Sequence, residues 1–149
     1  EWWRRFSPSV RPDIIAMNFY GRGRHAILDV SIARHLCSSV VSSAAHIPLF
    51  TSAKREHDKL AAYDDVPAPH TAIPFVVEAS GALGTHASTF IQYCSKLRRD
   101  ALVQERDKAT WAARTFSPFW RQRISVIQHH ICGMGIYTRA AEDAYLGDG

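Results

Sequence analysis

HAILDVSIA, residues 25–33, is the most informative segment of the chain, because its side chains alternate between two faces as they do in a β-strand. Leu28, Val30 and Ile32 share one face, which we expect to be buried, so that Val30→Ala costs about 1–3 kcal/mol. Asp29 lies on the other face, and burying an ionised carboxylate without a partner is strongly unfavourable. Asp29 therefore belongs either to a structural ion pair with an arginine or to a functional site.

The segment before this strand predicts a hairpin. Residues 13–19, DIIAMNF, indicate a strand, and Gly21 and Gly23 supply a turn. Such a hairpin brings Asp13 and Asp29 to one end of the sheet, where two carboxylates repel unless positive charge lies between them. Mg²⁺ typically binds one or two carboxylates together with phosphate and water. Asp13 and Asp29 are therefore candidate ligands of Mg²⁺ or Mn²⁺.

A helix is predicted after the hairpin, over AKREHDKLAAYDD, residues 53–65, with Thr51 or Ser52 as its N-cap. The prolines at 67 and 69 end this helix. Lys59 is the cation that we expect to approach the two acids, and Lys54 and Arg55 are the alternatives. Each of these basic residues, taken alone, is typical of a solvated helix face.

The rest of the chain predicts one strand and two helices. AIPFVVEA, residues 72–79, is strand-like, and Pro74 indicates that the strand begins after it or lies at a sheet edge. Thr85 opens a helical pattern, and Ser117-Pro118 begins another, which Gly133 and Gly135 are expected to break. The predicted order is β, β, helix, β, helix, helix.

Composition places the chain among ordinary globular domains. Its 149 residues are 46% hydrophobic and 21% charged, which excludes disordered and collagen-like sequences. The net charge is +4, and residues 1–50 hold six arginines against three acids. This basic bias indicates either a solvated face or contacts with DNA phosphates, for which Arg11, Arg22 and Arg24 are the candidates.

Several other classes of site are not predicted. Cys37, Cys94 and Cys132 form no C-x-x-C pair, which argues against a structural zinc site. No run of about 18 apolar residues is present, so we expect no membrane partner. The chain begins with Glu1, and we expect it to be a piece of a longer protein.

Two acids, a lysine and a hard metal ion favour phosphodiester hydrolysis. The metal polarises the phosphoryl oxygen and activates a bound water. The lysine orients that water or offsets the charge that develops on the phosphate. The sequence therefore favours a metal-dependent nuclease.

Pro12-Asp13, Asp29-Val30-Ser31 and a helix carrying Lys59 and Tyr63 resemble the PD-(D/E)xK nuclease pattern. The closer resemblance is to the restriction-endonuclease-like domain of reverse-transcriptase polyproteins of non-LTR retrotransposons. FVVE with GALG over residues 75–84, the helix starting at Ala87 and WRQRISV over residues 120–126 are similar to further parts of that family. The resemblance covers residues 11–131.

The resemblance implies an α/β (α+β) fold, a small mixed β-sheet flanked by helices, with a C-terminal helical extension. We expect an irregular lead-in over residues 1–10 and the helical extension over 101–149, and the resemblance implies an endonuclease-like core over 11–100. The implied activity is Mg²⁺- or Mn²⁺-dependent nicking of DNA, which generates the 3′ end that primes reverse transcription. The implied partners are DNA, the element RNA and the reverse-transcriptase domain of the same polyprotein, in the nucleus of a eukaryotic host.

Residue by residue, the resemblance assigns metal binding to Asp13 and Asp29 and the catalytic lysine to Lys59. Ser31 stands where the general pattern has its lysine, and Ala62 where the family helix often has a second one. Ser31 and Glu78 are possible additional site residues, and Glu78 is equally well explained as a structural acid beside the glycine turn.

Two other hypotheses remain beside the nuclease. The departures at Ser31 and Ala62 favour an inactive nucleic-acid-binding module descended from such a nuclease. An α+β interaction domain with structural aspartates is the third hypothesis. A nuclease requires Asp13 and Asp29 close enough to share an ion, with Lys59 facing them. A solvent-directed Lys59 would favour the module, and acids on opposite sheet faces would favour the interaction domain.

Overall fold

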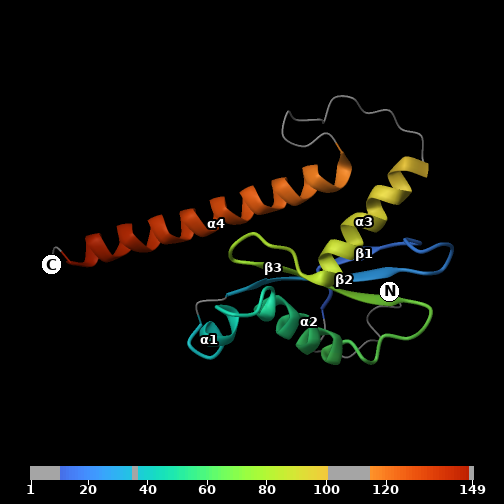
Figure 1. The fold of residues 1–149 in the computed structure, drawn as a ribbon, viewed down its shortest axis with the longest axis horizontal. Coiled ribbons are helices and arrows are strands. Elements are labelled where there is room, and N and C mark those ends of the chain that lie inside the picture. Colours follow the sequence, from blue (N-terminus) through green and yellow to red (C-terminus); the bar gives the residue numbers. More distant parts are fainter. Residues whose placement is uncertain (1–10, 35–36, 101–114, 148–149) are drawn as a thin grey trace.

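The computed structural model describes residues 11–34, 37–100 and 115–147 and contains a three-stranded mixed sheet with helices (Figure 1). This mixed α/β architecture, with a small mixed sheet, is the predicted class. The expected irregular segment 1–10 and residues 101–114 of the expected extension lie outside the described residues. No helix in the described parts is both long enough and apolar enough to cross a membrane.

The sheet has the order β1-β2-β3. β1 (Ile14–Ala16) is antiparallel to β2 (Ala26–Ala33), which confirms the predicted hairpin, and β3 (Thr71–Glu78) is parallel to β2. Gly21 and Gly23 in the hairpin turn have φ values of 111° and 76°, which glycine adopts with little strain. The turn chemistry in the sequence therefore identified the hairpin correctly.

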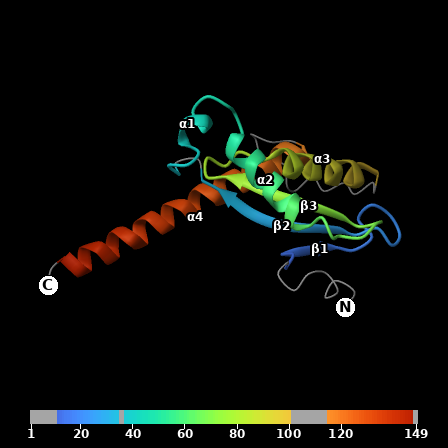
Figure 2. The ribbon, with the colours of Figure 1, turned by 90° about the horizontal axis from the view of Figure 1, so that it is seen from below.

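Two helices cover opposite faces of the sheet. α2 (Phe50–Ala62), which follows the short α1 (Val41–Ala44), lies on the face that carries Asp29. α3 (Thr85–Asp100) packs on the other face, as Figure 1 shows; in Figure 2, seen from below, α2 lies nearer the viewer than the fainter α3. The described elements therefore follow the predicted order of two strands, a helix, a strand and two helices, and α1 is an additional short helix before α2.

The predicted start of α2 was wrong. The N-cap is Leu49, which has a left-handed φ of 58° and makes no side-chain capping bond. The Thr51 hydroxyl and the Ser52 amide lie inside the helix and donate instead to Glu78 on β3, at 2.9 and 3.2 Å. The Glu78 carboxylate, from a distant strand, thus accepts the helix-start amide that we expected a local side chain to cap.

β3 begins at Thr71 and runs through Pro74, so the expectation that the strand starts after this proline was wrong. The alternative, an edge position, is confirmed, because β3 is the last strand of the sheet. Proline has no amide hydrogen to donate, and an edge strand needs donors on only one side.

α4 (Phe116–Gly147) is continuous, so the predicted break at Gly133 and Gly135 was wrong. Each glycine costs roughly 1 kcal/mol relative to alanine in a helix, which is too little to end it. Gly81 has a φ of 84°, and a Cβ there would collide with Ser125 of α4. The absence of a side chain at Gly81 thus allows the first turns of α4 to approach the β3–α3 turn.

The apolar core lies between the sheet and α3. One cluster joins Val77, Leu83, Ala87 and Ile91 with Trp120 and Ile124 of α4, and a second joins Ala26, Leu28 and Ile73. The predicted burial was correct for Leu28, which is 3% exposed, and wrong for Val30 and Ile32, which are 43% and 46% exposed. β1 pairs with β2 only as far as Leu28, and the apolar clusters on this face include neither Val30 nor Ile32.

Candidate functional site

An ion pair between β2 and α2 forms the centre of the candidate site. Lys59 Nζ donates to both carboxylate oxygens of Asp29, at 2.7 and 2.8 Å. The side chain of Lys59 is 22% exposed and that of Asp29 is 12% exposed, so the pair is mostly buried but still accessible to solvent. The buried acid in the strand has therefore met a cation, and the cation is Lys59 rather than an arginine.

Tyr63 completes the contacts of Asp29. It follows Lys59 by one helical turn at the end of α2, and its hydroxyl donates to Asp29 Oδ2 at 2.9 Å. Burial raises the pKa of Tyr63, and the hydrogen bond to Asp29 and the negative charges of Asp29 and Asp13 raise that pKa further. Tyr63 is therefore a neutral donor, and Asp29 accepts three hydrogen bonds from the residues that the structure describes.

Asp13 lies at the same end of the hairpin. The register pairs Ile14 with Leu28, so the next position along each strand sets Asp13 beside Asp29. Asp13 Oδ2 accepts the backbone N–H of Val30 at 2.6 Å, and the side chain is exposed. The structure thus gathers Asp13, Asp29, Lys59 and Tyr63 in one region, with Lys59 directed at Asp29 rather than into solvent.

Ser31 lies two residues beyond Asp29, on the same face of β2 and opposite Val76 of β3. Its hydroxyl is buried and has no hydrogen-bond partner among the described residues. Ala62, the other departure from the family pattern, is exposed at the end of α2. Neither residue supplies a charge to the cluster, and among the described residues Lys59 is the lysine that contacts Asp29.

Glu78 is not part of this cluster. It pairs with Ala33, whereas Pro74 pairs with Asp29, so the two acids are four residues apart along the strands, about 13 Å. Glu78 Oε1 accepts hydrogen bonds from the Thr51 hydroxyl and the Ser52 amide. Of the two roles left open for Glu78, its contacts fit the structural one, at the start of α2.

Glu56 is a buried acid that sequence reasoning missed. It is 4% exposed, accepts the backbone N–H of His86 at 2.9 Å, and lies 3.1 Å from His86 Nδ1. Its helical spacing from Ser52 and Lys59 places all three residues on one face of α2. That spacing could have identified Glu56 as facing the sheet.

The three candidate arginines are all exposed but occupy two places. Arg11 precedes Asp13 by two residues, at the end of the hairpin that holds the acids. Arg22 and Arg24 belong to the hairpin turn at the opposite end, beyond Ala26. A phosphate at the acids is therefore within reach of Arg11 alone among the three, and the turn arginines lie farther along the sheet.

Within the described residues, no group of three or more His, Cys, Asp or Glu side chains is placed to hold a metal ion. Comparison of the chain with known proteins gives no matching family model, no matching curated protein and no matching solved structure. Asp13, Asp29, Lys59 and Tyr63 therefore make up the candidate functional site.

Proposed function

We propose that this chain is a divalent-metal-dependent DNA endonuclease domain that nicks DNA, of the restriction-endonuclease-like type found in non-LTR retrotransposon polyproteins. The observation that carries the proposal is the contact of Lys59 Nζ with both oxygens of Asp29. A lysine from a helix, brought onto the acid of a central strand, is the arrangement that the resemblance implies when Ser31 replaces the strand lysine.

The donor chemistry fits a hard divalent cation. Asp13 and Asp29 would supply carboxylate oxygens, and Mg²⁺ commonly binds through one or two carboxylates with waters and substrate phosphate in its other positions. When bound, such an ion polarises the phosphoryl group and acidifies a coordinated water. Asp13 keeps one oxygen on the Val30 amide, which fixes the orientation of its carboxylate.

Lys59 and Tyr63 have separate roles in this proposal. Lys59 is partly exposed and holds its ammonium beside Asp29, where it offsets negative charge that develops on a phosphate. Tyr63 is buried, so it acts as a positioning residue that holds Asp29 Oδ2 through its hydroxyl. Exposed Arg11 is suited to hold a neighbouring phosphate of the DNA backbone.

Nicking of supercoiled plasmid DNA with Mg²⁺ or Mn²⁺ tests the proposal. Asp29→Asn and Lys59→Met should each lower the nicking rate about a hundredfold or more. Asp58→Asn and Lys54→Met are matched controls on exposed positions of α2 and should nick at the wild-type rate. Site variants that are folded and nick like the wild type would refute the assignment of Asp29 and Lys59.

DNA binding, measured in parallel, separates binding from cutting. The Asp29→Asn variant should retain salt-dependent DNA binding, because the arginines remain. Arg11→Ala should lower the dependence of log K on log salt by about 0.9 if Arg11 contacts one phosphate. On this proposal the further partners are the element RNA and the reverse-transcriptase domain, and the location is nuclear.

A second candidate is an inactive nucleic-acid-binding module. Asp29 already accepts three hydrogen bonds, and Ser31 places a neutral hydroxyl where the general pattern has its lysine. Wild-type protein that binds DNA in a salt-dependent manner, but cuts neither with Mg²⁺ nor with Mn²⁺ in the intact polyprotein, would establish this candidate. Absence of DNA binding would instead support the interaction domain.

A further inference from the structure

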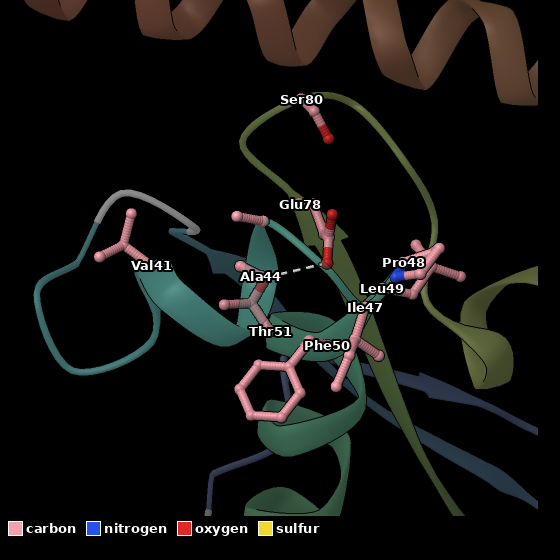
Figure 3. A pocket seen from close by; sticks show the side chains of 10 residues that line it. Val41, Ala44, Ile47, Pro48, Leu49, Phe50, Thr51, Glu78 and Ser80 are labelled. Atoms are coloured by element: carbon pink, nitrogen blue, oxygen red, sulfur yellow. Dashed lines mark hydrogen bonds between the residues drawn. The ribbon is translucent and has the colours of Figure 1, made fainter.

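A pocket of about 320 Å³ lies between α1, the start of α2 and the end of β3, away from the Asp29 cluster. Its walls are mostly apolar and include Val41, Ala44, Ile47, Leu49 and Phe50. Figure 3 shows these side chains around the carboxylate of Glu78, with Ser80 above it. An apolar chamber with a single acid in it is suited to a ligand that has an apolar body and a positive or hydrogen-donating end.

The two oxygens of Glu78 differ. Oε1 accepts hydrogen bonds from the Thr51 hydroxyl and the Ser52 amide. Oε2 has no hydrogen-bond partner among the residues that the structure describes, and in Figure 3 this second oxygen points toward Ser80. Glu78 as a residue is only 8% exposed, and Oε2 is not among the fully buried oxygens that lack a partner in the described residues, so this oxygen stays open to a ligand in the pocket.

We propose that this pocket binds a primary ammonium group on an aliphatic stem, with Glu78 Oε2 as its acceptor. A carboxylate oxygen that lies open at the pocket can accept a hydrogen bond from a charged donor, and such charge-assisted hydrogen bonds are the strong ones. The aliphatic stem packs against Ala44, Ile47 and Leu49, as the stem of a lysine does on apolar surface. The Ser80 hydroxyl is a second acceptor at the pocket.

The geometry favours an ammonium over a guanidinium. A guanidinium is planar and pairs best with both oxygens of a carboxylate, whereas an ammonium is a compact charge that one oxygen can hold. Oε1 is already committed to the start of α2. The inference is independent of the nuclease proposal, because Glu78 and Asp29 lie about 13 Å apart along the strands.

Titration of the full chain with n-pentylammonium, followed by NMR chemical shifts, tests the inference. Shifts should saturate and be largest around Ala44, Thr51 and Glu78. Glu78→Gln keeps an oxygen for Thr51 and Ser52 but removes the charge, and should weaken binding about tenfold or more. 1-Pentanol and n-pentylguanidinium are the ligand controls, and both should bind more weakly than the ammonium.

Two variants guard against misfolding as an explanation. Ala44→Leu leaves Glu78 intact and fills the pocket, so it should also abolish binding. Ser80→Ala should weaken binding less than Glu78→Gln. Equal binding of pentylammonium and pentanol, or wild-type affinity in folded Glu78→Gln, would overturn the inference.

The same titration distinguishes two sources of the ammonium. Cadaverine represents a free aliphatic amine, and a short peptide with one central lysine represents a partner protein. Tighter binding of cadaverine assigns the pocket to small amines, and tighter binding of the peptide assigns it to a lysine side chain. If neither cadaverine nor the peptide binds, the proposal is wrong.

Discussion

The two faces of the sheet differ in what they bury. The α3 face buries apolar side chains from β2, β3 and α3, including Leu28, Ile73, Val77 and Ile91. The α2 face buries Ile27 and Val76 too, but it sets ionisable groups between them: Asp29, Glu56, Lys59, Tyr63 and Glu78. The same strands serve both faces, because their side chains alternate.

This difference separates stability from chemistry. Apolar burial on the α3 face gives a non-directional driving force for folding. Buried polar groups on the α2 face need partners, and the pairs Asp29–Lys59 and Glu78–Ser52 supply them, whereas the buried Ser31 hydroxyl has none among the described residues. A face that must satisfy its charges in fixed positions is also the face that can present them to a ligand.

The largest expected effect tests the stabilising role of the α3 face. Ile91→Ala should lower the free energy of unfolding by about 2–5 kcal/mol, because Ile91 is 7% exposed and packs in the apolar cluster. Urea denaturation measures this cost. Leu97→Ala on the same helix is the matched control and should cost much less, since Leu97 is 40% exposed. Similar costs at the two positions would refute the separation of roles.

The next effect concerns the Asp29–Lys59 pair. Asp29→Asn and Lys59→Met should each cost about 1–3 kcal/mol, because each leaves a largely buried partner without its counter-charge. The double variant should cost less than the sum, with a coupling energy of about 0.5–3 kcal/mol in a double-mutant cycle. Strictly additive costs would show that the two residues do not act as a unit.

A pH effect should follow from Tyr63. The pKa of Tyr63 is raised in the folded protein. Its contribution to the free energy of unfolding is therefore fully present below its ordinary pKa of about 10 and is lost as the pH rises above that value. Urea unfolding between pH 8 and pH 11 measures this loss. The Tyr63→Phe variant should be less stable than the wild type at pH 8, and its free energy of unfolding should fall less steeply as the pH rises. Tyr137→Phe, at a position 74% exposed, should decline like the wild type.

The smallest effect refines the boundary of the α3 face. Val30→Ala should cost less than about 1 kcal/mol, because Val30 is 43% exposed, rather than the 1–3 kcal/mol that strand alternation suggested. Leu28→Ala, two residues earlier on the same face, should cost at least twice as much, since Leu28 is 3% exposed. Equal costs would place Val30 inside the core.

Local features of the sequence predicted the elements well. Gly21 and Gly23 identified the hairpin turn, and the apolar run before Glu78 identified β3. The predicted N-cap of α2 was wrong because Thr51 and Ser52 contact Glu78, which lies 27 and 26 residues later in the chain, and no local pattern records that contact. The burial of Val30 was wrong because alternation assigns a face but not the extent to which other elements cover it.

The candidate site was predicted in part by residue chemistry and in part by resemblance. The cost of burying Asp29 predicted that this acid would have a partner, and the structure supplies one. Spacing alone did not distinguish Lys59 from Lys54 and Arg55, and the family resemblance made that choice. Tyr63 follows Lys59 by four residues, which places both side chains on one face of a helix. This spacing could have predicted that the Tyr63 hydroxyl also contacts Asp29.

The bond from the Val30 amide to Asp13 Oδ2 makes one backbone proton a reporter of the candidate site. β1 begins at Ile14, one residue after Asp13, and beyond that end of the strand the Asp13 carboxylate rather than a backbone carbonyl accepts the Val30 amide. Any ion drawn to this carboxylate pulls electron density away from the oxygen that holds the amide. The nitrogen and proton frequencies of Val30 should therefore shift on addition of Mg²⁺, even in a chain that never cuts DNA.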